Sequence, residues 1–346
     1  MINLLDLQLN ELEELMKELG EPKFRAAQIF GWLYKEAGKG AADFDGMTNV
    51  PAALRQKLSD ISVIGLPQIL RVQESKLDGT RKYLFGLSDG NAVESVFMQY
   101  KFGNSICVSS QAGCRMGCSF CASTLDGLVR NLTPGEIAGQ ILSAERDTGR
   151  RISHVVVMGS GEPFDNYENL SGFIRIINDP KGLNIGMRNI TVSTCGIVPM
   201  IERFGEDFPQ VNLAISLHAS DDSRRSELMP VNRKYPLAEL LKACKKYAEK
   251  TSRRVTFEYT LVKGVNDSEE NAERLAALLC GMLCHVNLIP LNTVKERKFE
   301  TTGKAAAQRF REKLESRGIP ATIRRELGDD IDAACGQLRR STMMEK

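Results

Sequence analysis

The stretch CRMGCSFCAST, which begins at Cys114, carries three thiols at a spacing suited to metal binding. Cys114, Cys118 and Cys121 follow the pattern C-x3-C-x2-C. A structural zinc site normally takes four ligands in a tetrahedron, whereas an iron–sulfur cluster held by three cysteines keeps one iron open for another ligand. The three cysteines therefore predict an iron–sulfur cluster, and a zinc site completed by a distant ligand such as His218 is the alternative.

Four more groups of polar residues and glycines lie, like the cysteines, directly after short apolar segments. The apolar segments are SICVSSQ, SHVVVM, NITV, VNLAI and HVNLI, and the residues that follow or end them are 114–121, 159–163, 193–196, 216–218 and 290–292. In folds with parallel strands, ligands bind at the carboxyl ends of the strands. We therefore expect these five groups to meet at one mouth.

The elements that must position these residues alternate between strand and helix. Short segments rich in β-branched residues are separated by helical patterns such as TPGEIAGQILSAERDTG and LAELLKACKKYAEKT. This alternation predicts an α/β fold with a parallel sheet covered by helices, either an open doubly wound sheet or a full or partial barrel.

The chain before this region divides into two smaller parts. The first twenty residues, FRAAQIFGWLYKEAGKG and the stretch after Pro51 show the apolar spacing of helices. QILRVQES, TRKYLFGLSDG and AVESVFMQY show the pattern of short strands. We predict a helical accessory domain over residues 1–60, a β extension over 61–100, a core barrel over 101–330 and a C-terminal tail over 331–346.

Composition excludes several classes of protein. The chain has 346 residues, of which 42% are hydrophobic and 26% charged, as expected for one large globular domain and a small one. It contains no run of about twenty apolar residues, and its acidic amphipathic start differs from a secretion signal, so we expect a cytoplasmic protein without membrane segments. Nine cysteines fit no even-numbered disulfide framework.

Charge gives little information about nucleic acid. A net charge of +2 is too small to predict an RNA partner by itself. Basic pairs such as Arg150-Arg151 and Arg224-Arg225 would contact phosphates if they shared one face, but solvated surface charge is the simpler interpretation. Trp32 is a candidate stacking residue for RNA, although core packing is the more common role.

Motifs in a fixed order extend well beyond the cysteines. They are VSSQAGCRMGCSFCAST, GLVRNLT, MGSGEP, STCGIVP, SLHA, ELMPVN, HVNLIPLN and IRRELGDDIDAACGQLRR. Over nearly the whole core and the helical N-terminal extension, the chain resembles the RlmN/Cfr family of radical S-adenosylmethionine (SAM) RNA methyltransferases. It is more similar to the RlmN side, because MGSGEP keeps its proline and HVNLIPLNTVKERKF its RlmN-like form. The resemblance implies a partial (β/α)6 barrel.

The resemblance also implies a set of cofactor ligands. Cys114, Cys118 and Cys121 would hold a [4Fe-4S] cluster whose open iron binds the amino and carboxylate groups of SAM. Gly161 and Glu162 match the element that holds the SAM amino group, where a glycine allows close backbone approach and a carboxylate pairs with an ammonium. Further positions that match family contacts to SAM are Ser193, Ser216, Leu217, His218 and Asn292.

The chemistry of the family requires two more cysteines. Carbon 2 of adenine is flanked by ring nitrogens and is electrophilic, so it cannot attack the methyl group of SAM. By resemblance, Cys335 takes a methyl group from one SAM, a radical formed from a second SAM removes a hydrogen atom from that methyl, and the carbon radical adds to adenine. Cys107 then pairs with Cys335 in a disulfide that must be reduced before the next turnover. Glu94 matches the proton acceptor.

Without the resemblance, these residues have simpler interpretations. Cys107 on an apolar strand and Cys335 in AACGQ would be small buried residues. Glu94 would be an outward charge on an alternating strand, and His218 a core histidine. The cysteines without family support are interpreted as structural: Cys195, Cys244, Cys280 and Cys284.

We therefore predict a radical SAM methyltransferase that forms 2-methyladenosine in 23S ribosomal RNA, with transfer RNA as a second substrate. We expect a monomer that uses an electron donor such as flavodoxin or ferredoxin. Three alternatives remain: a Cfr-type enzyme that methylates carbon 8 of the same adenine, a non-methylating radical SAM enzyme such as an activase, and an RNA-binding protein with a structural metal cluster. Substitution of Cys335 by alanine separates both methyltransferases from the other two, because only they would lose methyl transfer.

Overall fold

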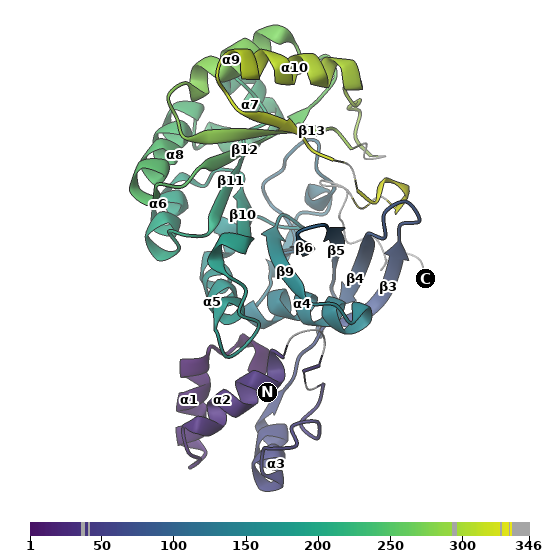
Figure 1. Cartoon of the computed structure of the whole chain (residues 1–346), viewed down its shortest axis with the longest axis vertical. Coiled ribbons are helices and arrows are strands. Elements are labelled where there is room, and N and C mark those ends of the chain that lie inside the picture. Colours follow the sequence, from purple (N-terminus) through teal and green to yellow (C-terminus); the bar gives the residue numbers. More distant parts are fainter. Residues whose placement is uncertain (36–38, 41, 293–295, 326, 332, 334–346) are drawn as a thin grey trace.

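The computed structural model describes residues 1–35, 39–40, 42–292, 296–325, 327–331 and 333. Its main element is a ten-stranded sheet in the order β14-β13-β12-β11-β10-β9-β6-β5-β4-β3 (Figure 1). From β6 to β14 in this order neighbouring strands are parallel, whereas β3, β4, β5 and β6 pair antiparallel. The predicted α/β fold with a parallel sheet is confirmed. The strands are β3 (Gln68–Glu74), β4 (Arg81–Gly86), β5 (Ala92–Tyr100), β6 (Gly103–Val108), β9 (Ile152–Val157), β10 (Ile190–Thr194), β11 (Asn212–Ser216), β12 (Val255–Leu261), β13 (Cys284–Pro290) and β14 (Ala321–Ile323).

Helices alternate with the parallel strands, and most of them lie on the outer side of the curved sheet (Figure 1). They are α4 (Pro134–Thr148), α5 (Tyr167–Asn178), α6 (Val198–Asp207), α7 (Asp222–Leu228), α8 (Leu237–Thr251), α9 (Glu269–Leu279) and α10 (Lys304–Ser316). Local sequence sets their ends. For example, Thr133 and Glu136 form a capping box at the start of α4, and Gly149 ends that helix with a φ of 63°. None of the helices in the described ranges is long and apolar enough to cross a lipid bilayer.

The described part of the N-terminal region contains three α-helices, and two of them are shorter than the sequence pattern predicts. These helices are α1 (Leu9–Glu18), α2 (Phe24–Leu33) and α3 (Ala52–Ile61). The helix expected over residues 1–20 begins only at Leu9, because Ile2 and Asn3 form strand β1, which pairs with β2 (Ser62–Val63). The helix expected over residues 24–40 ends at Leu33.

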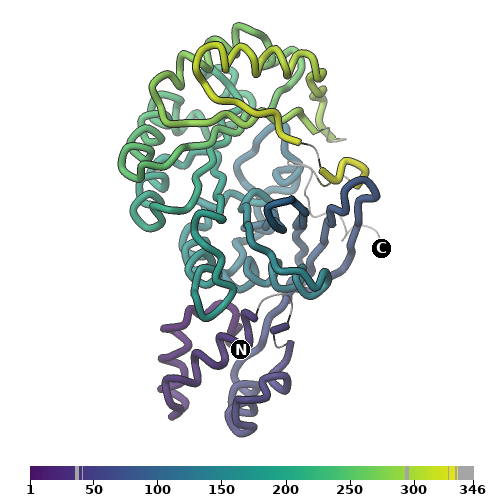
Figure 2. The backbone as a smooth tube through the Cα atoms, viewed as in Figure 1, coloured from purple at the N-terminus to yellow at the C-terminus, as the bar shows by residue number. Residues whose placement is uncertain are grey.

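This N-terminal region packs directly on the barrel. Leu4 and Leu5 are fully buried and belong to the same apolar core as the parallel strands. The hydroxyl of Tyr34 donates to the Leu5 carbonyl at 2.7 Å, and the Gly135 N–H at the start of α4 donates to Asp6 Oδ1 at 2.8 Å. The division of the chain at residues 60, 100 and 330 stays a prediction. Figure 2 traces the chain from these helices to the C-terminal segment beside β3 and β4.

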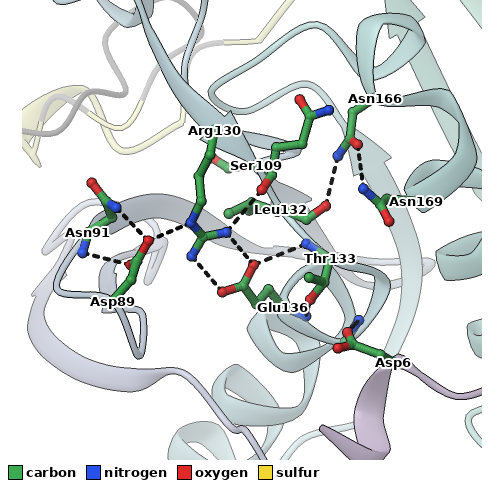
Figure 3. A network of polar contacts seen from close by, with 12 residues as sticks. Asp6, Asp89, Asn91, Ser109, Arg130, Leu132, Thr133, Glu136, Asn166 and Asn169 are labelled. Atoms are coloured by element: carbon green, nitrogen blue, oxygen red, sulfur yellow. Dashed lines mark hydrogen bonds and ion pairs between the residues drawn. The ribbon is translucent and has the colours of Figure 1, made fainter. Parts of the chain in front are cut away.

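A polar network anchors the loop that carries the cysteine motif (Figure 3). This loop connects β7 (Gln111–Gly113) with β8 (Leu128–Asn131), and the two short strands pair with each other. Arg130 on β8 donates to both carboxylate oxygens of Glu136 at 2.7 Å and also to Asp89, in the turn between β4 and β5. The network therefore links the cysteine loop to the β extension and to α4.

Candidate active site

A pocket opens where the parallel strands β9 to β13 end. Each of the five groups of residues that follow apolar segments contributes to its lining, so the predicted meeting of strand ends is confirmed. The predicted site residues that line the pocket are Cys114, Cys118, Cys121, Gly161, Glu162, Ser193, Ser216, His218 and Asn292.

The cysteine loop is held by hydrogen bonds from within the motif to neighbouring parts of the chain. The Cys114 N–H donates to the Gly127 carbonyl at 3.0 Å, and the Ser119 N–H donates to the Leu228 carbonyl at 2.9 Å. The Thr124 hydroxyl lies within 3.1 Å of the Cys118 carbonyl and 3.0 Å of the Cys121 carbonyl. These bonds fix the backbone from which the three thiols project.

Two thiols of the motif, those of Cys114 and Cys118, are poor acids in this environment. Burial, and the negative charges that Glu162 and Cys121 would bring, raise the pKa of Cys114 to about 12. Burial likewise raises the pKa of Cys118. A bound metal supplies the positive charge that stabilises thiolates, and metal binding then releases protons. Within the described ranges, no three cysteine, histidine or carboxylate side chains surround the position of a single metal ion.

Glu162 brings a buried carboxylate to the pocket wall. Its Oε1 accepts from the Phe164 N–H at 3.0 Å, and its Oε2 accepts from the Cys195 N–H at 2.7 Å. Burial raises the pKa of Glu162, although these hydrogen bonds act in the opposite direction. No lysine or arginine among the described residues forms an ion pair with it. A buried carboxylate that has no cationic partner favours binding of a ligand that carries a cationic group.

Gly161 permits the backbone path that presents Glu162. Its φ is 108°, a conformation that residues with a Cβ rarely adopt. A Cβ at this position would lie 2.6 Å from the Gln111 Cβ and 2.7 Å from the Gln111 backbone nitrogen. Glycine is therefore required here by both conformation and space.

His218 lies at the end of β11 as a neutral base with a fixed tautomer. Its Nδ1 accepts from the Thr260 N–H at 2.9 Å, so the ring proton is on Nε2. Burial, together with the charge of Arg225, lowers the pKa of His218 to about 3. The imidazole meets the Phe120 ring edge to face, with centroids 4.8 Å apart, and both residues line the pocket. The pair offers flat surfaces to an aromatic ligand group.

The remaining predicted SAM contacts are only partly brought together. Ser193 and Ser216 line the pocket at the ends of β10 and β11, and Asn292 lines it after β13. Leu217 is fully buried in the apolar core and does not line the pocket. Its N–H donates to the Glu258 carbonyl at 3.0 Å, which joins β11 to β12.

Glu94 and Cys107 lie on adjacent strands, outside the pocket lining. Cys107 on β6 pairs with Val96 on β5, and Glu94 precedes Val96 by two residues on the same face. The Lys82 Nζ lies 3.7 Å from Glu94 Oε1, and both side chains are buried. The carboxylate of Glu94 therefore faces a cation rather than solvent.

A small apolar cluster joins Cys107 to the C-terminal segment. Cys107 packs with Val96, Met98 and Ala333, and Met158 packs against this cluster while also lining the pocket. Cys335 lies outside the described residues. Ala333, which is described, precedes it by two positions.

Comparisons with known proteins agree with this geometry. The family model of the radical SAM superfamily matches residues 108–276, and that of the ribosomal RNA large subunit methyltransferase N-terminal domain matches residues 2–64. A protein from Clostridium perfringens named "Probable dual-specificity RNA methyltransferase RlmN" is 55% identical over 346 residues, which cover 100% of this chain and 99% of that protein. A protein of the same name from Clostridioides difficile is 55% identical over 331 residues, 96% of this chain and 95% of that one. The chain belongs to the RlmN family of radical SAM RNA methyltransferases.

A solved structure supports the same assignment. The crystal structure of a radical SAM methyltransferase from Sphaerobacter thermophilus has a TM-score of 0.94 and 48% sequence identity, covering 98% of this chain and 100% of that one. The predicted partial radical SAM barrel with an N-terminal helical region is confirmed.

The pocket fits the two groups that membership of the RlmN family implies, a [4Fe-4S] cluster and SAM. Cys114, Cys118 and Cys121 line one side with soft sulfur donors of the kind that iron–sulfur clusters take. Glu162 contributes a buried carboxylate without a cationic partner in the described chain. The donor set therefore suits a cluster beside a ligand with a positively charged amino group.

The pocket of this RlmN-family chain also depends on an arginine whose place in a basic pair, Arg224-Arg225, predicted surface charge. Arg225 is fully buried and donates to the carbonyls of Cys195 at 2.8 Å and of Leu217 and Ser216 at 3.2 Å. It thus holds together the ends of β10 and β11. The sequence feature that could have predicted the burial of Arg225 is its spacing. Arg225 precedes Leu228 by three residues and therefore lies on the same buried face of α7.

Other lining residues were missed for similar reasons. Cys195, interpreted as structural, lines the pocket and packs in one apolar cluster with Cys118. Glu258 and Arg324 also line it. The sequence did carry a signal for Glu258, because a carboxylate inside the apolar strand RVTFEYTLV is unusual.

Proposed function

We propose that this protein methylates carbon 2 of an adenine in 23S ribosomal RNA, with transfer RNA as a second substrate, through a methyl group held on Cys335. Its curated relatives bear the name dual-specificity RNA methyltransferase. The electrophilic carbon 2 of adenine cannot attack a methyl donor, so the methyl group must first be held by a nucleophile of the protein. A thiolate is the side chain best suited to that displacement.

The observation that carries this proposal is the apolar cluster that Cys107 shares with the C-terminal segment. Ala333 belongs to the same cluster as Cys107, and Met158 packs against that cluster while lining the pocket. Two residues of chain span at most about 7 Å. Cys335 therefore follows, by no more than about 7 Å of chain, a residue of the cluster that contains Cys107.

Each residue of this group has a separate task in the proposed reaction. The thiolate of Cys335 displaces the methyl group from its donor, forming a carbon–sulfur bond. Glu94 accepts the proton that leaves carbon 2 of the ring. The thiolate of Cys107 attacks the sulfur of Cys335, so that a disulfide forms as the carbon–sulfur bond breaks. The released carbon takes up a proton and becomes the methyl group on the ring, and the unpaired electron returns to the electron carrier. A thiol reductant then restores both cysteines, which suits a reducing cytoplasm.

The pocket residues hold the cofactors in this proposal. Cys114, Cys118 and Cys121 are the cluster ligands, and Glu162 receives the amino group of SAM. Ser193, Ser216, His218 and Asn292 complete the SAM contacts, whereas Leu217 only joins the strands behind them, through its N–H bond to the Glu258 carbonyl. When bound, the cluster supplies an electron, and two SAM molecules per turnover supply the methyl group and a hydrogen-abstracting radical. An electron donor such as flavodoxin or ferredoxin delivers the electron to the cluster. We also propose that the protein acts as a monomer.

The test is an anaerobic methylation assay. The protein is reconstituted with iron and sulfide and incubated with SAM, a reductant and a 23S ribosomal RNA fragment that lacks the modification. The RNA is digested, and methyladenosine is identified by mass spectrometry against both isomers. We expect 2-methyladenosine from the wild-type protein and from Cys280→Ser, a control at an exposed cysteine. We expect no product from Cys335→Ala.

Three results would contradict the proposal. Formation of 8-methyladenosine would assign the protein a Cfr-type regiochemistry. Cleavage of SAM without methylated RNA would mean that the substrate or the methyl transfer is wrong. Undiminished product from Cys335→Ala would rule out the methyl-cysteine route. A transfer RNA run under the same conditions tests the second substrate.

A further inference from the structure

The C-terminal segment passes from one edge of the open sheet to the other. β14 is one edge strand of the ten-stranded sheet, and β3 is the opposite edge. After β14, the Arg324 N–H still donates to the Leu288 carbonyl of β13 at 2.8 Å. A few residues later the segment lies beside the turn between β3 and β4, as Figures 1 and 2 show. The segment therefore spans the open side of the partial barrel.

Two reciprocal hydrogen bonds fasten the segment to this turn. The Gly328 N–H donates to Asp78 Oδ2 at 3.0 Å, and the Lys76 N–H donates to Asp330 Oδ2 at 3.0 Å. Each side thus offers one carboxylate to a backbone N–H of the other. The second oxygen of Asp78 accepts from the Thr80 N–H at 2.9 Å, which holds the turn itself in shape.

The fit between the two parts is close. Gly328 has a φ of 63°, and a Cβ there would lie 2.8 Å from the Ala333 Cβ and 3.0 Å from Thr80 Cγ2. The Ile331 and Ala333 N–H groups both donate to the Gly328 carbonyl at 3.1 Å, so the segment folds back on itself at this glycine. A larger residue would separate the segment from the turn.

The folded segment presents its apolar side to the wall that carries Cys107. Leu327, Ile331 and Ala333 all belong to or pack against the cluster of Val96, Met98 and Cys107. The polar bonds at the turn and the apolar contacts at this wall act on the same short stretch of chain. Together they set the position of Ala333, the last described residue before Cys335.

We propose that the turn of residues 75–80 is a dock for the C-terminal segment, that Asp78 and Asp330 fasten it, and that the dock sets the approach of Cys335 to Cys107. Asp78 and Asp330 are positioning residues in this proposal, because they act through the segment. The part that concerns Cys335 rests on the proposed function.

The dock is tested first by hydrogen exchange of the cluster-loaded full chain, read by mass spectrometry. Removing one hydrogen bond to a carboxylate corresponds to roughly a tenfold change in an opening equilibrium. Asp78→Ala should therefore make residues 327–331 exchange roughly tenfold faster, and Asp78→Asn, which keeps an oxygen acceptor, should do so less. Unchanged exchange of 327–331 in Asp78→Ala would overturn the dock.

Two further variants separate the dock from general damage. Asp179→Ala removes an equivalent aspartate bond, to the Lys181 N–H at 2.8 Å, in a loop after α5. It should leave the exchange of residues 327–331 unchanged. Asp330→Ala, at an exposed position, should speed exchange in residues 75–80 without disturbing the β3–β4 turn bond of Asp78. If Asp330→Ala and Asp179→Ala behave alike, the proposal fails even where Asp78→Ala folds poorly.

The approach of Cys335 to Cys107 has its own readout. Without SAM or RNA, limiting diamide takes two electrons and two protons from the two thiols, becomes a hydrazine and leaves a disulfide, which peptide mapping quantifies. We expect the Cys107–Cys335 bond to form roughly tenfold more slowly in Asp78→Ala and in Asp330→Ala, and at the wild-type rate in Asp179→Ala. Equal rates in all variants would overturn this part. The readout needs no methyl transfer, so a failed methylation assay would contradict the proposed function alone.

Discussion

Glu162 has a carboxylate whose two oxygens are oriented by the N–H groups of Phe164 and Cys195. These bonds compensate part of the cost of burying a charge, and a cationic ligand group would compensate more. Glu162→Gln keeps an oxygen acceptor but removes the charge. We expect it to weaken SAM binding by roughly 10- to 100-fold, the effect of losing a charge-assisted hydrogen bond. Equilibrium dialysis with labelled SAM on the cluster-loaded protein measures this.

The control for that substitution is Glu168→Gln. Glu168 is exposed and pairs with Arg203. SAM affinity should be unaffected in this variant, and the electron paramagnetic resonance signal of the reduced cluster should persist in both variants. Equal SAM affinity in Glu162→Gln and wild type would remove Glu162 from the binding site.

His218 makes the stability of the fold depend on pH. Its pKa is about 3 in the folded protein and 6.5 in an unperturbed histidine, so between these values the unfolded chain takes up a proton that the folded chain does not. The stabilisation is complete above pH 6.5 and is lost progressively as the pH falls toward 3. His218→Asn, a residue that tolerates the positive φ of 56°, removes this dependence.

The expected difference is measurable by denaturant unfolding at pH 6.5 and at pH 5. Over this interval the free energy of unfolding of the wild type should fall by up to about 2 kcal/mol more than that of His218→Asn. Parallel losses in the two proteins would show that His218 titrates normally in the fold.

At the scale of elements, Arg225 connects α7 with the ends of β10 and β11. Arg225→Lys keeps a positive charge but cannot reach the carbonyls of Cys195, Ser216 and Leu217 with a single ammonium as the guanidinium does. Because buried acceptors would lose their partners, we expect the free energy of unfolding to fall by about 2–4 kcal/mol.

The adjacent arginine provides a matched control. Arg224 is partly exposed and pairs with Glu227, so Arg224→Lys should change stability by less than about 0.5 kcal/mol. Thermal and denaturant unfolding of the two variants side by side check both values. Equal stability in the two would mean that Arg225 does not organise the strand ends.

This contrast also shows what the sequence could predict. The ends of the strands were predictable, because the strand pattern and the polar residues that follow each strand are local features of the sequence. Parallel strands also share one carboxyl edge, so these residues were expected to meet. The burial of Arg225 was not predictable, because two adjacent arginines have the same sequence pattern whether they are exposed to solvent or buried beside a pocket. The link from Asp78 to Gly328 joins positions 250 residues apart, and no local pattern encodes it.

At the scale of the whole molecule, the helical region and the barrel have one continuous core. Leu5 is fully buried in it, and the only tryptophan of the sequence, Trp32, lies in α2. Fluorescence of Trp32 therefore reports on the helical region, while circular dichroism reports on the entire chain. We expect both signals to change at the same temperature, and Leu5→Ala, a core truncation of about 2–5 kcal/mol, to lower both together. An earlier fluorescence transition would show that the helical region unfolds by itself.

The change from antiparallel to parallel pairing at β6 has a consequence for the order of folding. Strands β3 to β6 form a meander within residues 68–108, whereas β6 meets its parallel neighbour only across residues 104 and 152. Contacts close in sequence form faster than distant ones, and the N-terminal part of a chain leaves the ribosome first. Pulse-labelled hydrogen exchange during refolding should therefore show β3 to β6 protected before β9 to β13. The strand that carries Cys107 would then act as the template on which the barrel is assembled.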